Sequence, residues 1–372
     1  AKYIDECIVS ILSQTLTDIE VLCVDAGSTD GTIEKLNTFA QQDARIHVIH
    51  SDKKSYGYQI NLGLDAARGK FFGIVESDDY ILSNMYETLY GLAQQFQLDS
   101  IKSDFCIFYG DEKTRTFTTR FLTDDSKKYN RVLNPSEDIT LFKANNINPP
   151  GIYSLDFIRN CNIRLNETSG ASYQDNGLWF QIFAQSKRMY FYPCPFYMVR
   201  RDNPDSSVKS TKKIYCSCRE YDFIRGILKK DSKLEEKYAP LCALYRYNNY
   251  NFTLNRIAPE YQLGFLEKYS EDFREIEFNG ELKQNLFTIS QWKVLRQIMD
   301  DPDGFYRNRI ANKGSSVVVD SVLCTPKHGN SNPQIHDLTR RLNEANQEIR
   351  DIRSSWTYRI GRFMTWIPGK IR

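Results

Sequence analysis

Phe71-Phe72-Gly73-Ile74-Val75-Glu76-Ser77-Asp78-Asp79 runs from five mostly apolar residues directly into a cluster of three carboxylates. The apolar residues suit a buried strand of a parallel sheet. Acids gathered at the carboxyl end of such a strand repel one another unless a positive charge lies beside them. The stretch therefore predicts a strand that ends at a cation site.

The residue types at this strand end indicate which cation to expect. No His or Cys lies nearby, and hard carboxylate oxygens favour Mg²⁺ or Mn²⁺ over zinc. Such ions commonly hold substrate phosphates, so the expected ligand is a nucleotide diphosphate. The alternative is that Ser77-Asp78-Asp79 only caps a helix that starts near Leu82.

Strands and helices alternate through the first hundred residues. Apolar spacing and turn residues predict helices over residues 3–12, 33–41 and 61–67, and strands over residues 19–24, 45–50 and 71–75. This order predicts a mostly parallel, helix-covered sheet, which binds ligands at the carboxyl ends of its strands. Asp25 and the acidic cluster both follow such ends.

Composition limits the class of protein. A chain of 372 residues with 41% hydrophobic content can form two domains and a tail, and a net charge of +2 argues against a dedicated nucleic-acid binder. Nine cysteines show no metal-ligand spacing, and the sequence has no signal peptide and no apolar run long enough to span a bilayer. We therefore expect reduced thiols and a cytoplasmic location.

The chain divides into four parts by sequence pattern. We expect a nucleotide-binding α/β domain over residues 1–210, a helical subdomain over 211–312, a linker over 313–334 and an amphipathic tail over 335–372. The tail combines apolar residues at helical spacing with a basic, aromatic-rich end. It suits either peripheral contact with an anionic membrane surface or packing on the catalytic domain or on a second subunit.

Six motifs occur in order along the first 210 or so residues: Asp25-Ala26-Gly27-Ser28-Thr29-Asp30-Gly31-Thr32, Asn61-Leu62-Gly63, Arg68-Gly69-Lys70, Glu76-Ser77-Asp78-Asp79, residues 168–177 and residues 200–208. Each motif is weak alone, but the ordered set resembles bacterial family 2 glycosyltransferases of the GT-A fold. The resemblance implies a Rossmann-like α/β domain. That family opens with an apolar strand ahead of its first helix, whereas this sequence starts at the helix, so we expect either that the chain is a fragment or that the sheet lacks that strand.

The resemblance assigns roles to the acidic cluster. It makes Asp78 the metal ligand and places Glu76 at the position that contacts the metal or the nucleotide ribose. Glu76 replaces the commoner Asp, which moves its oxygens further from the strand. Asp79 is interpreted as a helix cap.

Four further residues are assigned to the donor by the same resemblance. Asp25 would recognise the edge of the base, and Asn61 stands where the family has an Arg-Asn pair, so that a cationic phosphate contact is missing there. Arg200 or Arg201 would close over the phosphates. The alternatives are that Asp25 only forms a turn and that both arginines are solvated.

Asp175 is the candidate general base. An inverting transfer needs a carboxylate that takes the proton of the acceptor hydroxyl as its oxygen attacks the anomeric carbon. Without the resemblance, Gln174-Asp175-Asn176-Gly177 would be interpreted as a helix start. The implied function is transfer of a sugar, expected from a UDP-sugar, to a glycan or lipid-linked acceptor in cell-surface polysaccharide synthesis.

Two other classes of function remain open from the sequence. One is a non-catalytic homologue that binds nucleotide sugars. The other is a sugar-phosphate nucleotidyltransferase on a similar sheet, which would ordinarily show a Gly-rich basic phosphate loop near its start, and none is visible.

Overall fold

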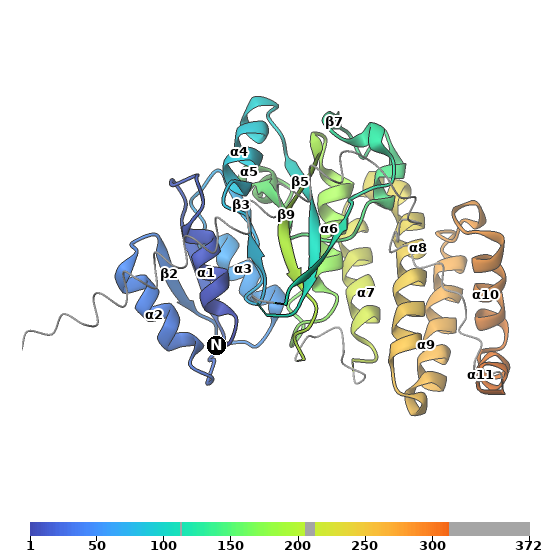
Figure 1. Cartoon of the computed structure of the whole chain (residues 1–372). Helices are drawn as coiled ribbons and strands as arrows, with labels where there is room; N and C mark the ends of the chain where they lie inside the picture. The colour runs from blue at the N-terminus through green and yellow to red at the C-terminus, as the bar shows by residue number, and fades with distance from the viewer. Residues whose placement is uncertain (112–113, 205–212, 312–372) are drawn as a thin grey trace, which may run out of the picture.

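A central sheet with helices on both faces continues into a row of helices (Figure 1). The computed structural model describes residues 1–111, 114–204 and 213–311. The fold is α/β with a helical C-terminal region, as the sequence predicts. The expected linker and tail, residues 313–334 and 335–372, lie outside the described residues, and the domain boundaries stay predictions.

The first elements follow the predicted alternation closely: α1 (Ile4–Leu12), β1 (Val21–Asp25), α2 (Thr32–Gln42), β2 (Ile46–His50) and α3 (Tyr56–Ala66). Strands β1 and β2 pair in parallel, with Asp25 opposite His50. Helix α3 begins at Tyr56 rather than at residue 61 because Ser55 caps it, its side chain accepting from the Tyr58 amide at 3.2 Å.

The larger sheet has the strand order β3-β8-β5-β9-β4, with β6 beside β5 and β7 beside β9. Its strands are β3 (Phe71–Gly73), β4 (Tyr80–Ile81), β5 (Ser100–Tyr109), β6 (Thr116–Arg120), β7 (Val132–Leu133), β8 (Gly151–Ser154) and β9 (Met189–Arg200). Only the β5–β9 pairing is parallel among its described strand pairs. The sheet is therefore mixed rather than mostly parallel. The short β5–β6 connection is one reason, since it permits only an antiparallel hairpin.

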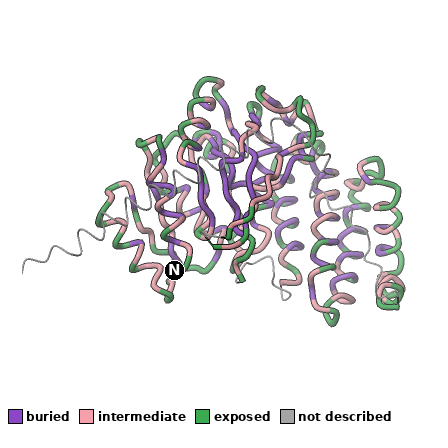
Figure 2. The backbone as a smooth tube through the Cα atoms, viewed as in Figure 1, coloured by how far each residue is buried: buried purple, intermediate pink, exposed green. Residues whose placement is uncertain are grey.

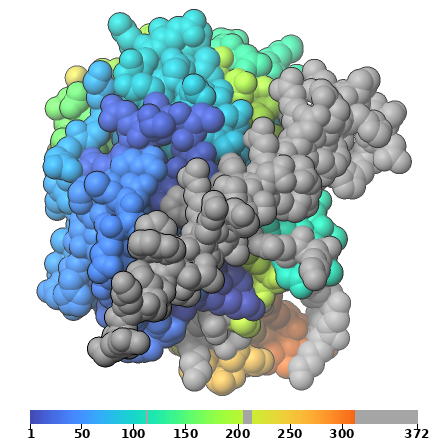
Figure 3. Space-filling model, turned by 60° about the vertical axis from the view of Figure 1, so that its left-hand side comes forward, coloured from blue at the N-terminus to red at the C-terminus, as the bar shows by residue number. Residues whose placement is uncertain are grey.

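Helices cover both faces of this sheet (Figure 1). On one face α1 and α4 (Met85–Gln95) pack in a core with Ile101, Phe105 and Tyr197 of the sheet. On the other, α5 (Leu155–Asn160) and α6 (Gln174–Gln185) pack in a second core with Phe191. Figure 2 shows this buried centre in purple. In Figure 3, the blue and cyan residues of the first third of the chain form one continuous face.

The helical region consists of α7 (Cys216–Leu228), α8 (Ser232–Arg256), α9 (Pro259–Phe278), α10 (Ile289–Asp300) and α11 (Pro302–Ala311). Its aromatic core includes Tyr250, Phe265 and Phe273. Within residues 1–111, 114–204 and 213–311, no helix combines the length and the apolar character needed to cross a membrane.

A buried ion pair joins α8 to α9. The Arg246 side chain is 1% exposed and donates to Asp272 at 2.6 Å and to the Tyr250 hydroxyl at 2.8 Å. Breaking a buried pair leaves a charge without its partner and costs far more than breaking an exposed one.

Asp272→Ala should lower the free energy of unfolding by about 3–5 kcal/mol, because the Arg246 guanidinium then loses its buried partner and, among the described ion pairs, keeps only the one with the exposed Asp222. Glu277→Ala is the matched control, since it breaks the exposed pair with Arg296 and should cost less than about 1 kcal/mol. Urea unfolding of both variants measures the difference. Equal losses would mean that the buried pair does not hold α8 and α9 together.

Candidate active site

A cavity of about 1440 Å³ lies between β1, β3 and the start of α3. Asp25, Glu76 and Asp78 line it, as three of the residues that the sequence singles out. Each follows a strand end, which is why the fold brings them to one edge. Gly170 and Asn203 contribute from two loops far along the chain.

Glu76 is held from two sides. The Tyr56 hydroxyl donates to its Oε1 at 2.9 Å, and its own amide donates to the Tyr197 hydroxyl at 2.9 Å. Burial raises the pKa of Glu76 to about 7; the Tyr56 hydrogen bond opposes the rise, and the charges of Asp78 and Asp175 add to it. Glu76 therefore lies close to other carboxylates, and a positive charge beside them would reduce their mutual repulsion.

Asp78 is fixed through both its side chain and its backbone. Its Oδ2 accepts from Asn203 Nδ2 at 2.7 Å, and its backbone oxygen accepts from Arg200 Nε at 3.0 Å. In the part of the chain that the structure describes, no group of three or more His, Cys, Asp or Glu side chains could hold a metal alone. Two carboxylates nevertheless fit Mg²⁺ or Mn²⁺, which take their remaining ligands from water and substrate phosphates.

Asp79 does not cap a helix, and that interpretation of the sequence is wrong. Its side chain is buried, and its Oδ1 accepts from the Arg200 amide at 2.7 Å. The chain enters β4 directly after Asp79, and α4 begins only at Met85 without a side-chain cap. The carboxylate therefore ties the acidic loop to the end of β9.

Asp25 uses its carboxylate on its own turn. It accepts from the amides of Gly27 at 2.8 Å and Ser28 at 2.9 Å, and from the Ser28 hydroxyl. Burial raises the pKa of Asp25, but these hydrogen bonds outweigh it and the pKa is lowered. Asp25 thus stays ionised and shapes the loop at the cavity wall, and its contact with a base stays a prediction.

Asn61 is buried and contacts protein on each side. Its Nδ2 donates to the backbone oxygen of Leu165 at 3.0 Å and to Glu167 at 3.1 Å, while its Oδ1 accepts from the Leu165 amide at 3.0 Å. Asn61 therefore fixes the segment that leads to α6 against α3. Asn61 is not among the described residues that line the cavity, and its contact with the donor stays a prediction.

The two arginines differ in their surroundings. Arg200 is buried; besides Asp78 it contacts Glu6 at 2.8 Å and stacks over the rings of Tyr3 and Phe108. Arg201 is exposed, and its charge lowers the pKa of Glu76. Arg201 is thus the arginine whose side chain is accessible beside the acidic groups.

Asp175 is the second residue of α6 and is exposed. The Asn148 side chain donates to its backbone oxygen at 2.8 Å. Desolvation by the surrounding protein raises the pKa of the Asp175 carboxyl, and the charge of Arg201 opposes this. The charge of Asp175 adds to the rise in the pKa of Glu76, although Asp175 is not among the described residues that line the cavity.

Three residues of the site were not predicted from the sequence as site residues: Tyr56, Tyr197 and Asn203. Asn203 lies in the motif over residues 200–208, and its place in that motif could have marked it as a site residue. The two tyrosines are among many aromatic residues of the chain, and only the tertiary fold shows that their hydroxyls meet Glu76.

Comparison with known proteins identifies the domain that carries this site. Residues 1–152 match the model of glycosyl transferase family 2. An uncharacterized glycosyltransferase, EpsJ of Bacillus subtilis, is 39% identical over 36% of this chain and 37% of its own length. Glycosyltransferase GlyG of Streptococcus pneumoniae is 42% identical over 27% of this chain and 34% of its own length. The chain therefore spans about a third of these relatives.

The solved structures agree on the fold. S. aureus TarS 1-349 in complex with UDP-GlcNAc superposes with a TM-score of 0.63 at 17% identity, covering 86% of this chain and 91% of that chain. The structure thus has the GT-A fold, and the resemblance to family 2 glycosyltransferases found in the sequence is confirmed for residues 1–152.

Gly57→Ala should disturb the site through backbone contact alone. A Cβ at Gly57 would lie 1.9 Å from the backbone oxygen of Asn166, so α3 and the 165–167 segment would have to separate. We expect a loss of about 1–3 kcal/mol in unfolding free energy. Gly226→Ala, on the open side of α7, meets nothing within 4 Å and should stabilise by about 0.5–1 kcal/mol. Thermal unfolding compares the two, and a neutral Gly57→Ala would contradict the close packing.

Proposed function

We propose that this protein is an inverting glycosyltransferase that moves a sugar from a nucleotide-diphosphate sugar to an acceptor hydroxyl. One observation carries the proposal. Glu76 and Asp78 line one cavity, and the charges of Asp78 and Asp175 both add to the rise in the pKa of Glu76 that burial causes. The acids that would hold the leaving diphosphate and the candidate base would then serve one reacting centre.

The donor we propose is a UDP-sugar. The support comes from the GT-A fold shared with TarS, whose structure was solved with UDP-GlcNAc. Asp25 and its turn would contact the base, and exposed Arg201 is better placed than buried Arg200 to reach the phosphates. Arg200 instead would hold Asp78 in place through its backbone.

A divalent cation, Mg²⁺ or Mn²⁺, is part of the proposal. Asp78 would hold it, with Glu76 as a second ligand. When bound there, the cation would neutralise charge on the departing diphosphate. Its chemistry also fits the crowding of acids that raises the pKa of Glu76.

Asp175 would act as the general base. As the acceptor oxygen forms its bond to the anomeric carbon, the bond from that carbon to the phosphate oxygen breaks, and the nucleoside diphosphate leaves with the electron pair. The proton of the acceptor hydroxyl passes to the carboxylate of Asp175. A raised pKa makes Asp175 a stronger base than an ordinary aspartate.

The acceptor we propose is a glycan or a lipid-linked sugar of cell-surface polysaccharide synthesis, as the family resemblance implies. Contact with the cytoplasmic face of the membrane, or self-association, through residues 335–372 stays a prediction, as does the cytoplasmic location.

Asp175→Asn should lower the release of UDP from the donor by about 10²–10⁴-fold, because the base is lost while the donor contacts remain. In the parent, kcat should rise with pH through a pKa above the usual 3.8 of aspartate, since only the ionised carboxylate accepts a proton. Steady-state assays across pH, with a panel of UDP-sugars and Mn²⁺, measure both.

Asp156→Asn makes the same chemical change at the second residue of another helix, α5, and should leave kcat unchanged. Equal rates for Asp175→Asn and the parent would reject Asp175 as the base. A parent that releases no nucleoside diphosphate from any donor would reject the function.

A further inference from the structure

The start of α6, which carries Asp175, is held in an uncommon backbone conformation. Tyr173 directly precedes the helix with φ +66°, in the left-handed region. Large residues adopt this region rarely, at a cost of order 1–3 kcal/mol, and such strain gathers at functional sites when surrounding contacts impose it. The contacts that impose it here come from the helical region.

The Tyr173 ring is fixed by α8 and, through it, by α7. Its hydroxyl shares a hydrogen bond of 2.6 Å with the Thr253 hydroxyl, and Thr253 shares another of 3.1 Å with Ser217. Thr253 and Ser217 are both fully buried. The Arg256 guanidinium lies 5.3 Å from the centre of the Tyr173 ring. The residue before α6 is therefore anchored to two helices outside the sheet domain.

A second contact reaches α6 just after Asp175. Glu220 of α7 is 1% exposed, and its Oε2 accepts from Asn166 Nδ2 at 3.0 Å. A Cβ placed on Gly177 would lie 2.2 Å from Glu220 Oε1, so the carboxyl lies directly against the first turn of α6. Burial raises the pKa of this carboxyl to about 8, and its hydrogen bond with the Gly177 backbone opposes the rise.

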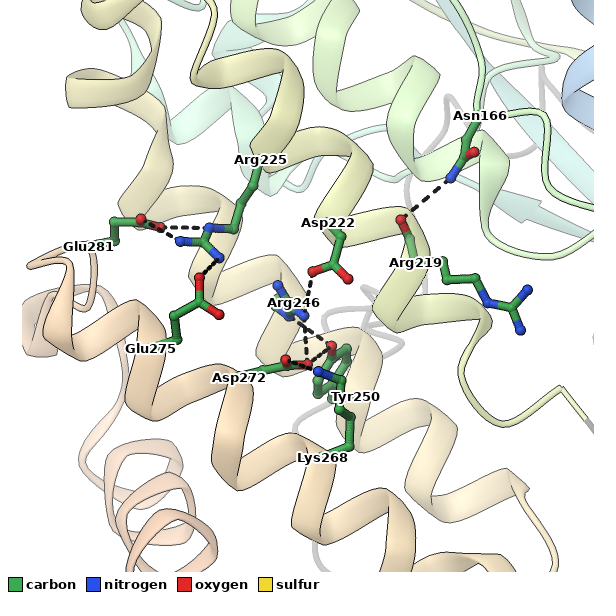
Figure 4. Close-up of polar contacts among 10 residues, drawn as sticks. All are labelled: Asn166, Arg219, Asp222, Arg225, Arg246, Tyr250, Lys268, Asp272, Glu275 and Glu281. Carbon is green, nitrogen blue, oxygen red and sulfur yellow. Dashed lines mark hydrogen bonds and ion pairs between the residues drawn. The ribbon is translucent and has the colours of Figure 1, made fainter.

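The helices that supply these contacts are themselves joined by ion pairs (Figure 4). Arg225 of α7 contacts Glu275 of α9 at 3.0 Å and Glu281 at 2.7 Å, and Arg246 of α8 contacts Asp222 of α7 at 2.9 Å. Asn166 lies beside α7 in the same view, near the backbone oxygen of Arg219. The helices that receive Tyr173 are thus linked to one another by ion pairs.

We propose that Tyr173 and Thr253 are positioning residues for the general base, with Glu220 supporting the same turn of helix from the other side. This inference rests on the proposed role of Asp175. The Asp175 carboxylate accepts from Asn176 Nδ2 only at a long 3.5 Å, so the position of the carboxylate depends on where the backbone of α6 begins. A displacement of about 1 Å at a reacting group can cost roughly 100-fold in rate.

The geometry assigns the helical region a part in catalysis without contact with the donor. The described residues that line the cavity come from elements of the sheet domain and their loops, and neither Thr253 nor Glu220 is among them. Loss of the Tyr173–Thr253 contact should therefore lower kcat while leaving the affinity for UDP intact.

Tyr173→Phe removes only the hydroxyl that meets Thr253. We expect it to lower kcat for UDP release from UDP-GlcNAc by roughly 10- to 100-fold, with the donor KM and the Kd for UDP unchanged. Amides of residues 174–178 should exchange hydrogen faster. Thr253→Val should reproduce the effect, and Thr253→Ser, which keeps the hydroxyl, should restore the parent values. In an Asp175→Asn background, Tyr173→Phe should add no further loss.

Tyr306→Phe is the matched control, because it removes a tyrosine hydroxyl from α11 whose contact among the described residues is the backbone oxygen of Pro259 at 3.5 Å. It should leave kcat and exchange unchanged. Gly177→Ala tests the second contact, since its methyl group must push Glu220 away, and it should also lower kcat without changing UDP affinity.

The outcomes distinguish failure of the positioning role from failure of the proposed glycosyltransferase function. Tyr173→Phe with parent kcat and parent exchange overturns the positioning role, and so does a variant that loses kcat, UDP affinity and melting temperature together. A parent that releases no UDP from UDP-GlcNAc or from the other donors contradicts the proposed function instead. Hydrogen exchange then decides alone whether the Tyr173–Thr253 contact holds the start of α6.

Discussion

The burial of Glu76 beside other carboxylates is the constraint on which the site depends. Glu76, Asp78 and Asp175 come close enough that two of them raise the pKa of the third. Three groups stabilise the acids: the Tyr56 hydroxyl donates to Glu76, the Asn203 side-chain amide donates to Asp78, and the charge of exposed Arg201 lowers the pKa of Glu76. A bound cation would complete this balance, and the same arrangement would then draw charge from a departing diphosphate.

The scaffold around the acids explains why they stay together. Asp79 follows Asp78 in the acidic motif, and Arg200 opens the motif over residues 200–208. Both serve mainly to join the acidic loop to the end of β9. Asn61 does the same for α3 and the segment before α6. Motif residues therefore divide into those that face the cavity and those that hold the facing residues in place.

The sequence predicted the first elements, the acidic strand end and the helix start at Asp175, because these are local patterns. It did not predict the antiparallel pairings of β8 or the end of β9 beside Asp79, since pairing partners far apart in the chain leave no periodic signal. The Tyr56–Glu76 and Tyr173–Thr253 contacts were missed for the same reason. An aromatic residue beside an apolar run is interpreted as core unless the fold shows what its hydroxyl meets.

The central claim is that Asp78 holds a cation against the diphosphate of the donor. Crystals grown with Mn²⁺ and UDP-GlcNAc, measured at the manganese absorption edge, test it most directly. If Asp78 holds the cation, an anomalous peak should lie between the Asp78 carboxylate and the diphosphate oxygens, at the roughly 2 Å ligand distances of a hard divalent ion. UDP seated in the cavity with no manganese beside Asp78, and the Asn203 contact to Asp78 unchanged, would contradict it.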